Sequence, residues 1–479
     1  MKYYKIFILL IIFLLLDMNA QQQTRVPWPS LADSPWPALR GDAQGTKRSE
    51  YVGPKTPNII WQKTYPTGII NGPILDKNGR MYIGSRRAAF SDTVNNFYCV
   101  DSNGNEIWRF HTISFFATDS APFIDSSGVI YFGCQNSYFY ALNPDGSLKW
   151  KYNSSSNFYS SHLVPDKAGN IYVANQDSLF CFRPDGSIKF KKAFDDNFKS
   201  PDAFLVFSPE GDRFYTTHVD AYNYFMLAID LNGNIIWEKE FSELTPSSIV
   251  VDNSGKLYAM GKETDSTDRG IFCLNRDGEV LWFSNYYEAN TYGSPTIDPD
   301  GNIIYPVYEG IASIDNQGNP RWIYNFEIDD YYGDLNYEEV FHSLISDAEG
   351  TIYAGSSVGN FFHAISTDGE LLWRIPLEGQ TSGMPAAIGK DGTLYFGLSW
   401  GFDNKPVINN LVAVRDKPNS VENDELPSVF TLEQNYPNPF NPSTTIKFGL
   451  PVNADVNISV YNILGQVVEV LADERMNAG

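Results

Sequence analysis

A pattern of short hydrophobic segments separated by turns that contain Asp and Gly recurs along most of the chain. Its clearest copy runs from Ala121 to Trp150 and reads APFIDSSGVIYFGCQNSYFYALNPDGSLKW. This copy divides into four short segments, PFID, VIYFG, YFYAL and SLKW, joined by the turns SSG and NPDG and by one longer loop. The pattern therefore predicts a unit of four antiparallel strands.

The first turn of this unit recurs before strands that contain a tyrosine. Most copies place an Asp three residues before a Gly, as in DKNGRMY, whereas SPEGDRFY is a degenerate copy. The copies lie at residues 76–82, 125–131, 166–172, 208–215, 252–258, 298–305, 347–353 and 390–395. Asp or Asn in such a turn bonds to its own backbone and Gly takes a positive φ, so we expect tight hairpins.

The second turn, of the NPDG type, recurs before strands that contain a tryptophan or, in one copy, Phe190. These aromatic residues are 40 to 51 residues apart, and a four-stranded propeller blade needs about 40–45 residues. They are Trp61, Trp108, Trp150, Phe190, Trp237, Trp282, Trp322 and Trp373. The repeat predicts an all-β fold, an eight-bladed β-propeller of four-stranded antiparallel blades over residues 58–414.

The tyrosine and tryptophan strands are out of phase at the two ends of the repeat. Trp61 precedes every tyrosine strand, and the last tyrosine strand, at 393–397, is followed by LVAV at 411–414 without a tryptophan. We therefore expect residues 58–63 to supply the outer strand of the last blade. This pairing closes the ring and removes free sheet edges.

Three of the four cysteines occupy one position of the repeat. Cys99, Cys181 and Cys273 align in the third strand with Ala141, and with Ala228, Ser313, Ala364 and Ala413 of the remaining blades. Equivalent positions on separate blades are too far apart for a disulfide. We expect these cysteines to be small core residues with free thiols.

Acidic residues outnumber basic residues by 57 to 35, which gives a formal net charge of −22. Such a chain repels polyanions, so nucleic acid is excluded as a partner. The repeated turns carry one or two acids before Gly, whereas a calcium loop places carboxylates at alternate positions and ends in Glu. We expect these turns to be structural.

The N-terminus has the features of a secretory signal peptide. The basic start MKYYK precedes an apolar segment, IFILLIIFLLL at 6–16, that is too short to span a bilayer, and we expect cleavage between Ala20 and Gln21. Because no later segment is long and apolar enough to span, we expect no transmembrane segment in the mature chain.

With the repeat laid out, residues 36–415 resemble the quinoprotein-like propellers, which are built from pyrroloquinoline-quinone (PQQ)-like repeats. The segment 36–61, WPALRGDAQGTKRSEYVGPKTPNIIW, resembles the lead-in to such propellers. Enzymes of this family bind PQQ and calcium at the funnel mouth, and many carry a disulfide between adjacent cysteines. Other members are non-catalytic scaffolds, including a lipoprotein of outer-membrane protein assembly. This chain has no adjacent cysteine pair and no calcium or catalytic motif, so we expect no cofactor, with PQQ and calcium as the alternative.

Residues 430–479 resemble the type A sorting domain of the type IX secretion system. The run NYPNPFNPSTTIKFGLP followed by VNISVYNILGQVV carries this resemblance. It implies a small Ig-like β-sandwich, truncated here because such domains usually continue beyond the equivalent of Gly479, and a partner in the type IX secretion machinery. The predicted order is a signal peptide (1–20), a lead-in segment (21–57), the propeller (58–414), a polar linker (415–429) and the sorting domain (430–479). We expect a secreted or cell-surface protein that passes through the periplasm.

Long loops from the second to the third strand and from the fourth strand to the next blade share one face, which we call the loop face. Aromatic residues mixed with carboxylates there suit a sugar, a cationic peptide or a metal, or else they are a solvated loop with tyrosines packed on the propeller. The candidate binding residues are Arg86, Arg87, Asp329, Asp330, Tyr331, Tyr332, Asp334, Tyr337 and Trp400.

Three functions remain open at this point. A regular structural repeat without a catalytic motif favours a non-enzymatic binding or scaffold protein with an unknown protein or glycan ligand. The alternative is a PQQ- and calcium-dependent oxidoreductase. The third is a scaffold of the export machinery, which would co-purify with envelope proteins.

Overall fold

The chain divides into two compact units, Met1–Arg415 and Asp416–Gly479. In this computed structural model the described residues are 22–65, 68–69, 73–86, 96–112, 122–134, 136–154, 156–158, 163–175, 177–193, 204–220, 223–244, 249–263, 268–289, 293–308, 310–325, 344–355, 361–377, 379–381, 386–401, 409–417, 430–432, 448–452, 454–461 and 466–476. Within these ranges the elements are β-strands without an α-helix, as the sequence predicts.

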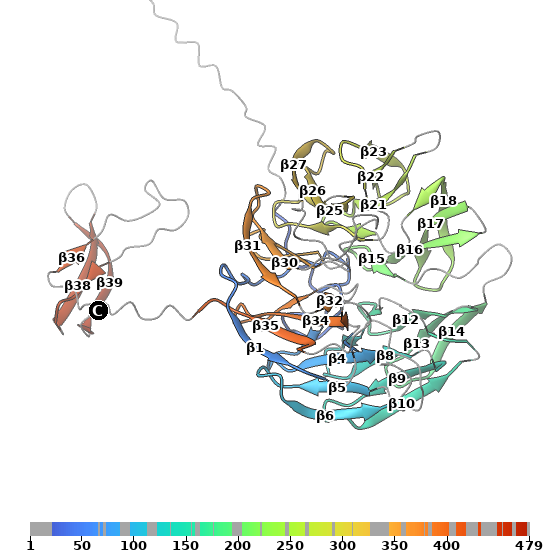
Figure 1. Ribbon diagram of the computed structural model, residues 1–479, viewed down its shortest axis with the longest axis horizontal. Helices are drawn as coiled ribbons and strands as arrows, with labels where there is room; N and C mark the ends of the chain where they lie inside the picture. Colours follow the sequence, from blue (N-terminus) through green and yellow to red (C-terminus); the bar gives the residue numbers. More distant parts are fainter. Residues whose placement is uncertain are drawn as a thin grey trace, which may run out of the picture. The chain divides into compact units, whose positions relative to one another are not determined.

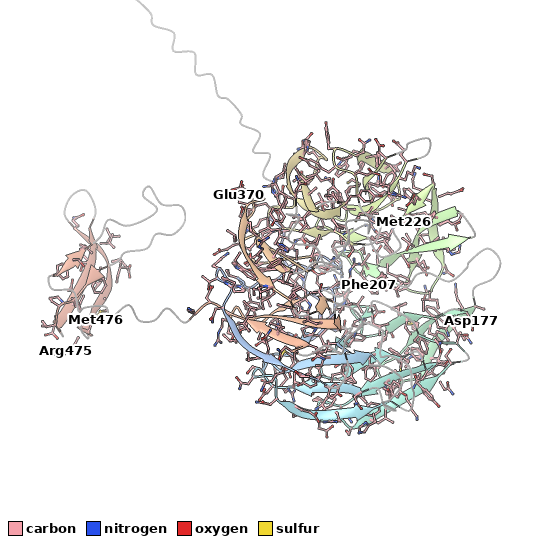
Figure 2. All side chains as sticks on the ribbon, viewed as in Figure 1. Asp177, Phe207, Met226, Glu370, Arg475 and Met476 are labelled. Atoms are coloured by element: carbon pink, nitrogen blue, oxygen red, sulfur yellow. The ribbon has the colours of Figure 1, made fainter. Side chains whose placement is uncertain are left out.

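The first unit is a β-propeller, in which the sheets surround a common centre (Figure 1). The described residues form eight sheets of four or five strands, a number compatible with the eight repeats. Figure 2 shows Phe207, on an inner strand, near the centre of the ring and Glu370, in a turn, at the rim. We number the blades in chain order from blade 1.

The strands of the first four blades follow the predicted order from the inner to the outer edge. Blade 1 contains β2 (Gly68–Ile69), β3 (Ile74–Leu75), β4 (Met81–Arg86), β5 (Asn96–Val100) and β6 (Glu106–His111). Blade 2 contains β7 (Phe123–Ile124), β8 (Ile130–Gly133), β9 (Tyr138–Leu142) and β10 (Leu148–Asn153). Blade 3 contains β11 (Val164–Pro165), β12 (Ile171–Ala174), β13 (Ser178–Phe182) and β14 (Ile188–Ala193). Blade 4 contains β15 (Val206–Phe207), β16 (Arg213–Asp220), β17 (Asn223–Asp230) and β18 (Ile235–Phe241).

The other four blades complete the ring. Blade 5 contains β19 (Glu243–Leu244), β20 (Val250–Val251), β21 (Leu257–Lys262), β22 (Arg269–Leu274) and β23 (Val280–Ser284). Blade 6 contains β24 (Thr296–Ile297), β25 (Ile303–Val307), β26 (Gly310–Ile314) and β27 (Pro320–Asn325). Blade 7 contains β28 (Ile345–Ser346), β29 (Ile352–Gly355), β30 (Phe361–Ile365) and β31 (Leu371–Pro376). Blade 8 contains β32 (Gly379–Thr381), β33 (Ala387–Ile388), β34 (Leu394–Gly401), β35 (Leu411–Val414) and β1 (Ile59–Lys63).

The predicted closing strand is present. Strand β1 pairs antiparallel with β35, which places Trp61 opposite Ala413. Blade 8 therefore joins one strand from the start of the propeller to four from its end. Because the ring is closed by backbone hydrogen bonds, the first and last blades cannot separate without breaking a sheet.

Within a blade, one small residue separates two aromatic rings. In blade 2, Ala141 of the third strand lies opposite both Tyr131 and Trp150, and the two ring centroids are 5.9 Å apart. Cys99, Cys181 and Cys273 hold the same position in their blades, opposite a tyrosine and Trp108, Phe190 or Trp282. All four cysteines are buried and free, as expected.

Blade 6 departs from the alignment of the tyrosines. Ile304, not Tyr305, lies opposite Ser313, because the turn keeps its usual length, with the N–H of Asp298 bonded to the carbonyl of Asn302, and the tyrosine comes one residue later in the strand. Tyr305 is still buried, and its hydroxyl donates a hydrogen bond to the carbonyl of Tyr287 at 3.2 Å. The tyrosine of this repeat therefore points to the opposite face of its strand.

The first-turn aspartates organise their own hairpins. In blade 2, Oδ1 of Asp125 accepts hydrogen bonds from the backbone N–H of Ser127 at 2.8 Å and of Val129 at 3.0 Å. Its Oδ2 accepts a hydrogen bond from the hydroxyl of Tyr131 at 2.8 Å, and Gly128 has a φ of +85°. These hydrogen bonds stabilise the hairpin, as the sequence predicts.

The second unit contains two short antiparallel sheets among its described residues. Strand β36 (Thr431–Leu432) pairs with β37 (Phe448–Gly449), and β38 (Ala454–Tyr461) pairs with β39 (Val467–Met476). The segment VNISVY, from the run that carries the resemblance to the sorting domain, contributes most of β38. The Ig-like sandwich stays a prediction.

Candidate functional site at the propeller axis

Of the loop-face residues predicted from the sequence, the structure describes two, and only their backbones. Arg86 and Trp400 lie in β4 and β34, where their backbones pair with Gly68 and Gln380, and their side chains are outside the description. The remaining candidates lie outside the described residues: Arg87, Asp329, Asp330, Tyr331, Tyr332, Asp334 and Tyr337, together with Ala20 and Gln21 at the expected cleavage point. These assignments stay predictions.

The described part of the propeller axis is filled by the chain itself. Residues 34–49, which we call the axial segment, are buried without exception. Its carbonyl oxygens accept hydrogen bonds from inner strands of six blades. The donor and acceptor residues are Leu75 to Trp36, Ile124 to Pro37, Phe207 to Ala43, Val251 to Gln44, Ile297 to Thr46 and Ser346 to Lys47, with N···O distances of 2.8 to 3.3 Å. The segment satisfies N–H groups that an inner sheet edge would otherwise leave unpaired.

The axial segment lies at one end of the axis. Leu75, Ile124 and their counterparts are the last residues of inner strands, directly before the first turns. The first and second turns of each blade lie on the face opposite the loop face, because antiparallel strands alternate in direction. We call this opposite face the turn face, and the axial segment lies at its end of the axis.

Two cations of the axial segment extend toward the loop face. The ammonium of Lys47, 1% exposed, donates hydrogen bonds to the carbonyl O of Ser294 at 2.8 Å and to its Oγ at 2.6 Å. The guanidinium of Arg40 donates to the carbonyl of Ile249 at 3.1 Å and lies 5.3 Å from the centroid of the Phe204 ring. Ser294 and Ile249 precede inner strands, so both cations bind the main chain nearer the loop face.

Burial changes the acid–base properties of this pair. It holds the pKa of the Lys47 ammonium well below its ordinary value, and the neighbouring charge of Arg40 acts in the same direction. Burial also lowers the pKa of Arg40, which the negative charge of Asp42 partly offsets. A site with these properties favours negative charge and disfavours a further cation.

Asp42 is the one acid of the axial segment, and its carboxylate is already engaged. Oδ1 accepts a hydrogen bond from the backbone N–H of Thr46 at 2.9 Å, and Oδ2 accepts one from the Thr46 hydroxyl. Calcium takes six to eight oxygen ligands, usually several from carboxylates. The axial segment, with three basic residues and one engaged acid, does not supply such a ligand set.

Sequence reasoning missed the axial segment. Residues 34–49 show neither strand alternation nor helical spacing, so local patterns identify them only as a lead-in. Their composition carried one usable signal, since Trp36 and Leu39 accompany three basic residues in a stretch that a solvated linker would fill with small polar residues.

Two family models match the sequence. Residues 434–478 match the secretion system C-terminal sorting domain, and residues 135–327 match the family described as outer membrane protein assembly factor BamB. The chain is a β-propeller with a C-terminal secretion sorting domain. The sorting domain directs this propeller to the type IX secretion system, and hence to the cell surface or the medium.

Solved structures similar to this propeller share its fold. BamB from Moraxella catarrhalis superposes with a TM-score of 0.52 and 12% sequence identity, covering 75% of this chain and 99% of that one. The Dos1 propeller superposes with a TM-score of 0.54 and 10% identity, covering 76% and 97%. A streptogramin B lyase, with a TM-score of 0.41 and 15% identity over 74% and 94%, is too distant to support an argument about activity.

A search of curated proteins found no match to the sequence. Among the residues that the structure describes, no helix is long and apolar enough to cross a membrane.

Proposed function

We propose that this exported propeller is a non-catalytic binding protein that presents a rigid surface outside the cell. One observation carries the proposal: the charged groups on the described part of the axis hold the blades together. Lys47 and Arg40 donate to main-chain carbonyls of the inner ring, and Asp42 accepts hydrogen bonds from Thr46. Side chains committed to the scaffold in this way are not available for acid–base or metal chemistry.

The ligand is a protein or a glycan, and we place its site on the loop face. Support comes from the sequence, where Asp329, Asp330, Tyr331 and Tyr332 stand together in one long loop. Aromatic rings stack on sugars and on guanidinium groups, and carboxylates accept hydrogen bonds from both. The closed ring below them is a rigid base, which keeps the conformational cost of binding low.

The test separates binding from catalysis in the full exported chain. We expect PQQ with calcium chloride to leave the Tm unchanged. A ligand that binds the folded protein would raise the Tm, since at about 100 times its Kd it adds about 2.7 kcal/mol to the stability of the folded state. Glycan and peptide arrays should show binding that alanine substitutions of Asp329, Asp330, Tyr331 and Tyr332 abolish. Alanine at the turn-face residues Asp145 and Asp185 is the matched control. A Tm rise with quinone and calcium, together with oxidation of an alcohol, aldehyde or sugar, would overturn the proposal in favour of an oxidoreductase.

The match of residues 135–327 to an assembly-factor family favours a second candidate, a scaffold in the export of envelope proteins. Such a scaffold would co-purify with outer-membrane proteins under mild solubilisation. A binding protein would instead be recovered alone from the cell surface or the medium.

A further inference from the structure

The turn face has a cavity of about 290 Å³ between blades 2 and 3. Its walls include Phe123, Asp125, Tyr131, Pro165 and Pro184, and Ser30 of the N-terminal segment contributes to the rim. Phe123 and Tyr131 stack with their centroids 4.7 Å apart. The volume is close to the lower end of the range for small-ligand pockets, about 300–1,000 Å³.

An arginine of the chain fills the equivalent gap between another pair of blades. Between blades 1 and 2, Arg80 follows the turn glycine, and its Nε donates a hydrogen bond to Oδ2 of Asp76 at 2.6 Å. Its Nη1 lies 3.5 Å from the carbonyl oxygen of Pro144 in the second turn of blade 2. The guanidinium therefore joins the first-turn acid of one blade to the second turn of the next.

A second gap is filled in a similar way. Between blades 4 and 5, Nη1 of Arg213 donates a hydrogen bond to the carbonyl of Arg276 at 3.3 Å, and Nη2 pairs with Asp212 at 3.3 Å. Arg276 occupies the same place in its turn as Pro144. In both gaps an arginine of the chain bonds to one carboxylate and one turn carbonyl.

Between blades 2 and 3, Val129 holds the position that Arg80 holds between blades 1 and 2. Valine follows the glycine of this turn, is 4% exposed, and brings no donor to the cavity. The two acceptors remain in place. Oδ2 of Asp125 accepts a hydrogen bond from the hydroxyl of Tyr131, and the carbonyl oxygen of Pro184 accepts one from the indole N–H of Trp150 at 3.0 Å.

Exposure of the first-turn acids agrees with an open site. Asp125 is partly exposed. The aspartates at the same place in five other blades are buried, with exposed fractions of 6% or less: Asp76, Asp166, Asp252, Asp298 and Asp347. A partly exposed carboxylate, in a protein of net charge −22, attracts a cation.

Lys167 also lines the cavity, but its charge is committed elsewhere. Its ammonium donates a hydrogen bond to the carbonyl of Pro209 in blade 4 at 2.7 Å and lies 5.0 Å from the centroid of the Trp28 ring. The alkyl stem of Lys167 therefore contributes apolar surface to the wall.

We propose that this cavity binds an arginine side chain of a partner polypeptide, which takes the place that Arg80 fills between blades 1 and 2. The guanidinium would donate to Asp125 and to the carbonyl of Pro184. The site lies on the turn face, so it does not depend on the function proposed for the loop face.

The experiment titrates the full exported chain with N-acetyl-arginine amide, followed by calorimetry and NMR. The citrulline analogue, which has nearly the same shape without the charge, should bind at least about tenfold more weakly, because it lacks the charge-assisted hydrogen bonds. Asp125→Asn should weaken binding of the arginine probe by a similar factor. Asp145→Asn, in the second turn of blade 2 and outside the cavity, should bind it like the wild type.

Val129→Arg supplies the occupant from the chain itself and should abolish binding of the probe while raising the Tm. If this variant does not fold, Asp125→Asn decides, since it preserves the shape of the cavity. Equal binding of arginine and citrulline probes, unchanged binding by Asp125→Asn, or no binding at the highest soluble probe concentration would each overturn the proposal. Alanine substitutions on the loop face should leave arginine binding unchanged, which separates this test from that of the proposed function.

Discussion

The indole of Trp150 lies directly over Gly186 of the next blade, where an added Cβ would come within 2.8 Å of the ring. Its Nε1 donates a hydrogen bond to the carbonyl of Pro184 in the same turn at 3.0 Å. Equivalent bonds run from Trp61 to Ser102, Trp108 to Pro144, Trp237 to Arg276, Trp322 to Thr367 and Trp373 to Pro54. Tryptophan and glycine recur in the repeat because together they form a contact between one blade and the next.

Gly186→Ala should destabilise the propeller by about 2–4 kcal/mol. Gly186 has a φ of +87°, which costs an L-residue about 1–2 kcal/mol, and the added methyl group collides with Trp150. Gly255→Ala is the matched control, because Gly255 has a φ of +85° but open space around a Cβ. Chemical unfolding should show a loss of only about 1–2 kcal/mol for the control. Equal losses would mean that contact with the tryptophan contributes nothing.

Tyr172→Phe should cost more than Tyr82→Phe, by about 1 kcal/mol. In blade 3, where Phe190 replaces the tryptophan, the hydroxyl of Tyr172 donates to the carbonyl of Leu231 at 2.9 Å. The equivalent carbonyl next to blade 1, that of Pro144, already accepts the indole of Trp108. Unfolding of both variants measures the difference.

Phe190→Trp provides a rescue for the same position. A tryptophan there brings an N–H to the carbonyl of Leu231, so adding this substitution to Tyr172→Phe should recover most of the lost stability. Failure of the double variant to regain stability would show that the tyrosine hydroxyl acts through another contact.

Lys47 should make stability depend on pH. Because its pKa in the folded protein is well below that in the unfolded chain, the unfolded chain binds more protons between the two values. Stability from this group therefore rises with pH through that window, up to the ordinary lysine pKa of about 10.4. The Tm of the wild type relative to Lys47→Met should increase between about pH 7 and pH 9. A difference that stays constant over this range would contradict the prediction.

The cysteine thiols should be inert in the folded protein. Burial raises the pKa of Cys99 and Cys273 to about 12 and that of Cys181 to about 11. The thiolate is the reactive form, so iodoacetamide at about pH 8 should label none of them before unfolding and all after it. These raised pKa values also mean that their contribution to stability falls as pH rises above about 9. Rapid labelling of the native chain would show that the third strands open.

The repeat itself was readable from the sequence because its signals are local. Strand alternation, turn glycines and the spacing of tryptophans each involve a few neighbouring residues, and they sufficed for the fold class, the free cysteines and the pairing of β1 with β35. The offset at Tyr305 was not readable, because blade 4 has the same spacing from Gly to Tyr and yet keeps Tyr215 opposite Ala228.

Only the tertiary structure decided how segments that are distant in the chain contact one another. The axial segment has its role because carbonyls such as those of Ala43 and Lys47 accept N–H groups from Phe207 and Ser346, far away in the chain. The cavity between blades 2 and 3 is lined by residues of both blades, among them Asp125 and Pro184, which are far apart in the chain. By itself the sequence determined which strands and turns form, since these depend on local geometry. How the ring's centre and gaps are filled depends on contacts that no local pattern records.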